Sequence, residues 1–285
     1  MPHKVKIEKG SVQETLMLPL YAKAWCRRHY PDIFGDCDAE RIIGMIDWDD
    51  EAFRRKEGSP ALKIAAVAAG TRQYAIACEL KDYTSRHPEA LLVNLGCGLD
   101  TTGRQADTGR CHLLNIDFPN VIALREELLP STDRERNMAA DLATCSGGEP
   151  AFLDAIPADA GQGAAFFACG VFLYLRKSDV KRILQALARR FPGGRIVFDA
   201  QNPLGASFDR KTLRKAGIRA GTNFSLRDPE AELSSWSSDF ASVRSRGMST
   251  GYLRPGLRFG PVYWALAHFA DWSRMSQLNV IDFKG

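Results

Sequence analysis

Two glycines and one acid stand where a bound nucleoside would need them. An apolar run beginning at Leu91 ends in Gly96-Cys97-Gly98, and a second apolar run ends in Asp117, 19 residues after Gly98. A short apolar run followed by Gly-x-Gly is typical of a buried strand that enters a tight turn. Glycine lets that backbone approach a ligand closely. A carboxylate at the tip of the next strand can accept bonds from both ribose hydroxyls. The pattern therefore predicts a nucleoside-containing cofactor.

The glycine turn does not choose between cofactors. Position 101 is Thr, where the dinucleotide fingerprint has its third glycine. Gly-x-Gly with Asp117 also suits NAD, so an NAD-dependent oxidoreductase stays an alternative. The missing glycine and the long segment before Leu91 count against it.

Alternating strands and helices should position these residues. From Leu91 the pattern predicts strands at 91–95, 111–116, about 135–140, 164–169 and 195–200, with helices at about 101–108, 119–129, 150–156 and 178–190. A helix at 260–275 and a closing strand at 278–283 follow. Such alternation predicts an α/β fold with a mostly parallel, Rossmann-like sheet.

The segment before Leu91 has no place in that sheet. Residues 11–30, 38–46 and 60–83 show helical patterns. We therefore expect residues 1–88 to form a helical cap on the carboxyl edge of the sheet. Residues 89–285 form the cofactor-binding domain, with a substrate-side insertion around 203–255 that is rich in Ser, Arg and Gly.

Composition narrows the class of protein. The 285 residues are 45% hydrophobic and 25% charged, as in ordinary soluble proteins, and the net charge of +4 is too mild to indicate nucleic acid as a partner. No apolar run approaches a membrane span, and the first residues lack the apolar core of a signal peptide. The seven scattered cysteines lack a Cys-x-x-Cys pair, which favours reduced thiols in a cytoplasm over disulfides or a metal site. Nothing indicates the oligomeric state.

Six segments, in order along the chain, resemble motifs of the leucine carboxyl methyltransferase family of class I S-adenosylmethionine (SAM)-dependent methyltransferases, including its bacterial polyketide O-methyltransferase branch. Two are specific: Val93-Asn-Leu-Gly-Cys-Gly-Leu-Asp-Thr101 resembles the family's glycine signature, and Asn115-Ile-Asp-Phe-Pro119 its Asp-(Phe/Leu)-Pro motif. The others are Thr15-Leu-Met-Leu-Pro-Leu-Tyr-Ala-Lys23, Asp36-Cys-Asp38-Ala39, Gly70-Thr-Arg72 and Ala168-Cys-Gly-Val-Phe-Leu-Tyr174-Leu175.

The resemblance implies a class I methyltransferase sheet, with one antiparallel C-terminal strand, that binds SAM. It implies a role for each matching residue. Lys23 and Arg72 would hold the carboxylate of the cofactor, Gly96 and Gly98 would admit its methionine part, Asp117 would bind the ribose, and Asp141 and Leu142 would flank the adenine. Cys169 stands where the family usually has Glu. A thiol cannot supply that charge, so another acid compensates or the chain is a catalytically degenerate SAM-binding protein.

Several of these residues have plainer interpretations. Asp100 would cap a helix, and Lys23 or Arg72 could be structural. Cys97 and Cys169 more often behave as small buried hydrophobes than as nucleophiles. Tyr174 is expected to be pocket wall rather than acid or base. His268, the one histidine of the C-terminal third, is a candidate base.

The leading hypothesis is a SAM-dependent O-methyltransferase. A carboxylate acceptor is already ionised, whereas a phenol with a pKa of about 10 needs a base. The lack of an obvious base favours a carboxylate or an acidic hydroxyl, on a small molecule or a protein C-terminus.

Overall fold

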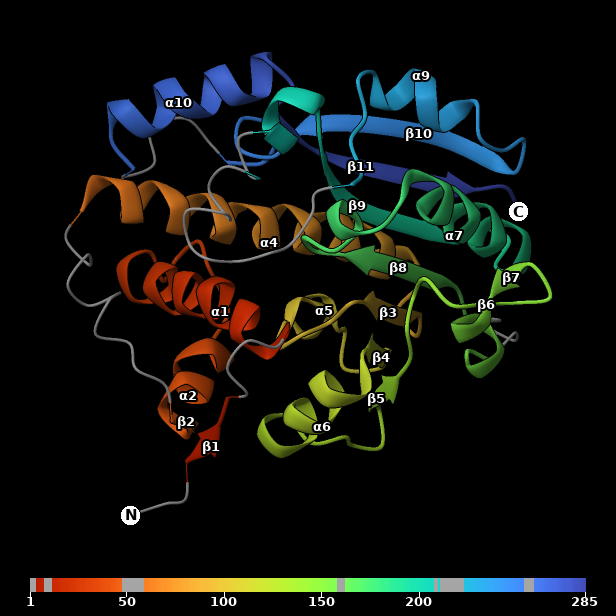
Figure 1. Cartoon of the computed structure of the whole chain (residues 1–285), viewed down its shortest axis with the longest axis horizontal. Coiled ribbons are helices and arrows are strands. Elements are labelled where there is room, and N and C mark those ends of the chain that lie inside the picture. Colours follow the sequence, from red (N-terminus) through yellow and green to blue (C-terminus); the bar gives the residue numbers. More distant parts are fainter. Residues whose placement is uncertain are drawn as a thin grey trace.

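A seven-stranded sheet forms the centre of the protein (Figure 1). The computed structural model describes residues 4–7, 12–47, 59–157, 162–207, 210, 223–253 and 259–285. The strand order is β10-β11-β9-β8-β3-β4-β5. The strands are β3 (Leu91–Leu95), β4 (His112–Asp117), β5 (Glu135–Ala139), β8 (Ala164–Ala168), β9 (Arg195–Gln201), β10 (Phe240–Gly247) and β11 (Ser276–Phe283).

The sheet confirms the predicted architecture. Strands β3, β4, β5, β8 and β9 are parallel, and β11 runs antiparallel to both β9 and β10. A single C-terminal strand is therefore reversed, as expected. The sequence did not reveal β10. It is an edge strand in which Ser, Arg and Gly interrupt Phe240 and Val243, and it is mostly only partly buried, so it lacks the apolar run that marks the inner strands.

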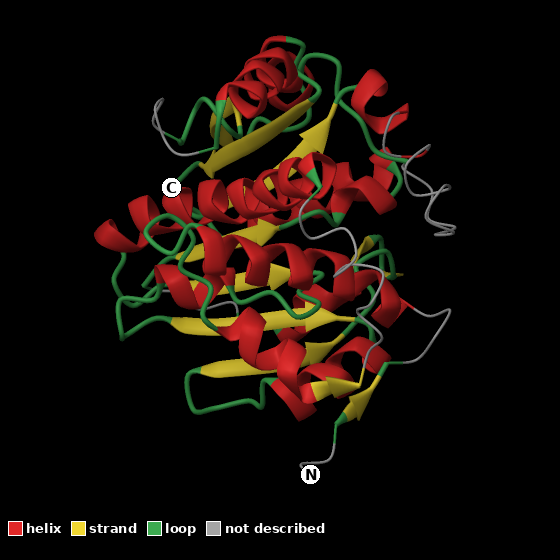
Figure 2. Ribbon diagram, turned by 90° about the vertical axis from the view of Figure 1, so that its left-hand side faces the viewer, coloured by secondary structure: helices red, strands yellow, loops and turns green. Residues whose placement is uncertain are grey.

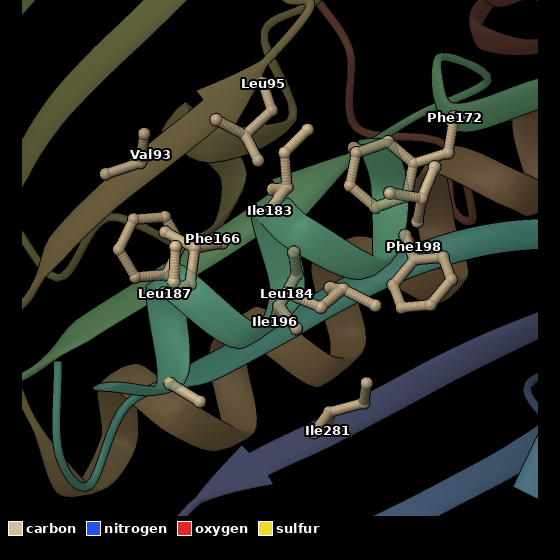
Figure 3. Close-up of a cluster of buried hydrophobic side chains, with 14 of the residues drawn as sticks. Val93, Leu95, Phe166, Phe172, Ile183, Leu184, Leu187, Ile196, Phe198 and Ile281 are labelled. Carbon is tan, nitrogen blue, oxygen red and sulfur yellow. The ribbon is translucent and has the colours of Figure 1, made fainter. Parts of the chain in front are cut away.

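Helices cover both faces of the sheet (Figure 2). On one face, α7 (Lys177–Arg190) places Ile183, Leu184 and Leu187 in a buried cluster with Val93 and Phe198 (Figure 3). On the other face, α4 (Pro60–Arg86) contributes apolar residues to a second cluster. Its members include Ile76, Leu80, Leu92, Phe167, Val197 and Val280. Successive strand residues such as Leu92 and Val93 point to opposite faces, because side chains alternate along a strand.

The N-terminal helices divide between two locations. Helix α1 (Val12–His29) reaches the carboxyl end of β3, where Lys23 contacts Asp100. Helix α2 (Asp38–Met45) packs on α1, and the short parallel strands β1 (Val5–Lys6) and β2 (Ile46–Asp47) form a separate pair. Helix α4 instead runs along the face of the sheet because its apolar side chains belong to the sheet's core. A cap that ended at residue 88 would include this core helix.

The remaining elements are short. They are α5 (Thr102–Ala106), α6 (Pro119–Leu128), α9 (Pro229–Ser234), α10 (Pro261–Trp272), the hairpin of β6 (Cys145–Ser146) and β7 (Glu149–Pro150), and the 3-10 turns η1 (Ala151–Ala155) and η2 (Phe172–Tyr174). The helix expected at 150–156 is thus a 3-10 turn, and α9 had not been predicted. None of the described helices combines the length and apolar character needed to cross a membrane.

One fully buried arginine braces the glycine turn. The guanidinium of Arg125 on α6 donates to the carbonyl oxygens of Gly98 at 3.0 Å and Asp100 at 2.8 Å, and to Glu135 at 3.2 Å. Its Nε donates to Asn137 at 2.8 Å. These bonds connect α6 and β5 to the turn after β3.

We predict that Arg125→Ala lowers the free energy of unfolding by about 3–5 kcal/mol, because it leaves the buried carbonyl oxygens of Gly98 and Asp100 without this donor and removes one of the two arginines that pair with Glu135. Urea denaturation measures the change. Arg110→Ala is the control, since Arg110 is exposed and pairs with Glu89 at the surface; it should cost at most about 1 kcal/mol. Equal losses in the two variants would contradict the bracing role.

Candidate cofactor and acceptor site

A cavity of about 790 Å³ opens at the carboxyl ends of the parallel strands. Its wall includes every residue predicted to bind a cofactor: Lys23, Arg72, Gly96, Gly98, Asp117, Asp141, Leu142 and Cys169. Tyr174 also lines it. These residues come from α1, α4 and the loops after β3, β4, β5 and β8, so the fold brings distant parts of the chain together.

The two glycines are required by backbone conformation and by space. Gly96 and Gly98 have φ angles of 69° and 47°, which side chains disfavour. A Cβ at Gly96 would lie 2.5 Å from Cγ1 of Val171, and one at Gly98 would lie 2.8 Å from Cδ2 of Leu16. Glycine therefore lets α1 and the loop after β8 close against the turn, as well as leaving its backbone at the cavity wall.

Asp117 is fixed at the tip of β4 by two backbone amides. Gly98 N–H donates to Oδ2 and Phe118 N–H to Oδ1, each at 2.7 Å. Burial raises the pKa of Asp117, although the two amides act in the opposite direction. Each carboxylate oxygen has a further lone pair, so the side chain can accept a pair of neighbouring hydroxyls while it stays anchored.

Asp100 is more than a helix cap. It accepts hydrogen bonds from the backbone and the hydroxyl of Thr102 at 3.1 and 2.8 Å, from Asn94 at 3.2 Å and from Gln73 at 3.4 Å, and it forms an ion pair with Lys23. Burial favours the protonated form, yet the Lys23 ammonium and the Thr102 bonds hold the pKa of Asp100 below its usual range. Lys23 thus lines the cavity with its charge already compensated, and within the described residues two of its three N–H groups have no bonded acceptor and can serve a ligand.

Arg72 is poorly satisfied by the protein itself. Its guanidinium lies against Gly170, where an added Cβ would come within 2.7 Å of one terminal nitrogen, and its salt bridge to Asp199 is long, at 3.5 Å. Within the described part of the chain its buried Nε has no acceptor. A guanidinium in this state at a cavity wall suits a ligand carboxylate, which accepts two parallel bonds. Arg72 therefore fits a cofactor that carries one.

The sequence analysis did not identify Asp199 as a candidate site residue. It lies near the end of β9, and its Oδ1 accepts the N–H of Gly170 at 2.5 Å. The signal was present, because an acid after the apolar run from Ile196 to Phe198 repeats the pattern that identified Asp117.

Cys169 lies among charged groups and stays a neutral thiol. Burial raises its pKa to about 11, although Arg72 lowers it. It also interacts electrostatically with Asp100, Lys23 and Asp199. Two carboxylates therefore surround the position where the family has Glu. Burial also raises the pKa of Cys97 far above neutrality, so neither thiol is activated as a nucleophile.

Asp141 and Leu142 follow β5 side by side on the cavity wall. The Asp141 carboxylate accepts from the backbone of Ala143 at 2.8 Å and from the hydroxyl of Thr144 at 3.3 Å, while Leu142 is buried. One polar and one apolar neighbour would suit adenine, and this role stays a prediction.

Only one of the two candidate catalytic residues lies at the cavity. Tyr174 is 41% exposed and faces the cavity. His268 is exposed on α10 and is absent from the cavity wall, with its ring 6.2 Å from that of Trp264. The structure therefore does not support His268 as a base. The residues of α10 and the preceding loop that do line the cavity are Met248, Ser249, Ala270 and Asp271, none of which had been predicted.

Comparison with known proteins identifies the family. A model of the leucine carboxyl methyltransferase family matches residues 53–188. The tetracenomycin polyketide synthesis O-methyltransferase TcmP of Streptomyces glaucescens is 30% identical over 222 residues, which cover 75% of this chain and 76% of that protein. The chain belongs to the leucine carboxyl methyltransferase family. It is a SAM-dependent methyltransferase, and this assignment decides against the NAD-dependent oxidoreductase.

Solved structures agree on the fold. A DUF574 family protein from Streptomyces avermitilis has a TM-score of 0.59 at 14% identity, covering 86% of this chain and 95% of its own. A putative methyltransferase from Thermobifida fusca has a TM-score of 0.54 at 17% identity, covering 77% and 83%.

We predict that iodoacetamide at about pH 7.5 modifies the exposed Cys37 and Cys145 and spares Cys169, because alkylation requires the thiolate. The raised pKa means that the Cys169 thiolate forms only as the pH approaches 11. Peptide mass spectrometry measures the sites, with urea-unfolded protein as the control in which all seven cysteines react. Rapid modification of Cys169 at neutral pH would contradict its assignment as a neutral wall residue.

Proposed function

We propose that this enzyme transfers the methyl group of SAM to an oxygen atom, a carboxylate or a hydroxyl, of a small molecule. The observation that carries the proposal is the single cavity that combines two chemistries. One part presents Asp117, Arg72 and Lys23 beside the glycine turn. The rest of the wall is largely apolar and includes Leu18, Leu173, Leu175 and Met248. The relative TcmP, named as a polyketide O-methyltransferase, supports an oxygen acceptor on a small molecule.

The residues of the polar part fit SAM. Asp117 would accept the ribose hydroxyls, Arg72 and Lys23 would bind the carboxylate, and Asp141 with Leu142 would flank the adenine. Gly96 and Gly98 leave the backbone accessible to the methionine part. SAM supplies an activated methyl group, so the protein mainly positions the two reactants and excludes water. The apolar part would desolvate the acceptor, and an already ionised acceptor would need no base.

The free state of the cysteines supports a cytoplasmic location. All seven are unpaired in the structure, and three of them, Cys26, Cys97 and Cys111, are buried. A reducing compartment keeps such thiols intact.

The cofactor part of the proposal is tested by calorimetric titration with SAM and its demethylated product, S-adenosylhomocysteine (SAH). Asp117→Ala removes two hydrogen bonds to a charged group, each worth about 1.5–3 kcal/mol, so we expect both affinities to fall about a hundredfold or more. Asp133→Ala, which removes an exposed acid outside the cavity wall, should bind like the wild type. Unchanged binding to Asp117→Ala would overturn the assigned ribose site.

The transfer itself is tested by incubation with SAM and a panel of phenols, aromatic acids and their amine counterparts, with SAH and the methylated product detected by mass spectrometry. We expect methylation at oxygen, lost or strongly reduced in Asp117→Ala at low SAM concentration. Products methylated only at nitrogen would contradict the proposal. SAM binding without turnover across the panel would instead identify a catalytically degenerate protein.

A further inference from the structure

A chain of hydroxyl groups leads from the interior of α4 to the cavity. Thr71 Oγ1 donates to the carbonyl oxygen of Val67 at 2.7 Å and lies 3.3 Å from Tyr263 Oη on α10. Tyr263 Oη lies 3.1 Å from Ser249 Oγ, and Ser249 is on the cavity wall. Thr71 and Tyr263 are buried, so the connection runs through the protein.

The first bond fixes the direction of all the others. A hydroxyl has one hydrogen, and Thr71 gives its own to a carbonyl oxygen, which can only accept. Thr71 Oγ1 must therefore accept from Tyr263, and Tyr263 Oη must accept from Ser249. The hydroxyl hydrogen of Ser249 is then donated to Tyr263 Oη. Toward the cavity it offers lone pairs alone.

A carboxylate on the same cavity wall, that of Asp271, bonds to Thr250, the residue after Ser249. Asp271 lines the cavity, and its Oδ2 accepts from the backbone and the hydroxyl of Thr250 at 2.7 and 2.6 Å. Among the described residues, no donor bonds to Oδ1. Glycine at position 247 makes room for the Asp271 side chain, since a Cβ at Gly247 would fall 2.2 Å from Asp271 Cγ. Two wall groups, connected through Thr250, thus present acceptors only.

We infer that Ser249 Oγ and Asp271 Oδ1 each accept a hydrogen bond from a hydroxyl group of the acceptor, and that they select hydroxylated acceptors over molecules that place a carboxylate there. An acceptor-only pair is satisfied by a hydrogen-bond donor. A carboxylate would set lone pairs and negative charge against them, and the basic groups of the described cavity wall, Arg72 and Lys23, are assigned to the carboxylate of the cofactor. This inference rests on the proposed function and names its substrate class.

The test uses protein saturated with SAH and three probes of one shape: 2-naphthol, 2-methoxynaphthalene and 2-naphthoate. 2-Naphthol donates a hydrogen bond, 2-methoxynaphthalene does not, and 2-naphthoate is anionic at neutral pH. We expect the wild type to bind 2-naphthol at least about tenfold more tightly than either of the others, as a hydrogen bond to a charged group implies.

Asp271→Asn gives the sharpest outcome. Its amide oxygen can still accept from Thr250, which places the amide N–H₂ toward the cavity. The preference should then reverse, with weaker 2-naphthol and tighter 2-naphthoate binding, a change that mere loss of structure would not produce. Ser249→Ala should weaken 2-naphthol alone, by several fold. Glu127→Gln, which removes an exposed acid on α6, is the matched control and should bind all three probes like the wild type.

Three results would each overturn the inference: equal affinity of the wild type for the three probes, no detectable binding of 2-naphthol to the wild type, or an unchanged order of preference in Asp271→Asn. SAH affinity, measured separately for each variant, distinguishes this failure from failure of the proposed function. Normal SAH binding without the predicted preference for 2-naphthol would contradict the hydroxyl-binding site alone. Lost SAH binding in the wild type would sink the cofactor assignment itself.

Discussion

The buried ion pair between Lys23 and Asp100 is the constraint on which the site depends. An unpaired carboxylate at that depth would be expensive to bury, so its partners must stay in place. Those partners come from α1, α4, β3 and α5: Lys23, Gln73, Asn94 and Thr102. A single carboxylate therefore ties two helices that precede the sheet to the glycine turn at its carboxyl edge. Because Leu16 of the same α1 helix closes on Gly98, the cavity wall and this ion pair form one unit.

Acids at the ends of parallel strands then define the cofactor part of the cavity. Asp117 ends β4 and is anchored by two amides, while Asp199, near the end of β9, holds Gly170 and touches Arg72. Both use backbone N–H groups at the strand ends as fixed donors. The neutral Cys169 lies between these charged groups, so the local field is set by Asp100 and Asp199 rather than by residue 169. The rest of the described wall is mostly apolar, and Ser249 and Asp271 are among its polar members, with Thr15, Gln201 and Ser276.

The sequence predicted well whatever rests on local pattern. The inner strands are short apolar runs, and the spacing from Gly98 to Asp117 located an acid on the cavity wall beside the glycine turn, because parallel strands bring their carboxyl ends together. The features that the sequence did not predict depend on contacts between distant segments. Helix α10 is apolar nearly all round, with Leu266, Phe269 and Trp272 exposed, so its pattern could not show that Asp271 rather than His268 faces the cavity. Strand β10 has no apolar run, and α4 has the composition of a cap helix although it packs on the sheet.

The measurement that tests this account most directly is a crystal structure of the protein with bound SAH. The account predicts that the ribose hydroxyls bind Asp117 and that the ligand carboxylate binds Arg72. It also predicts that the acceptor part of the cavity, between α1, α4 and α10, stays open beside Cys169. SAH bound elsewhere, or bound in this cavity with its ribose away from Asp117 and its carboxylate away from Arg72, would contradict it.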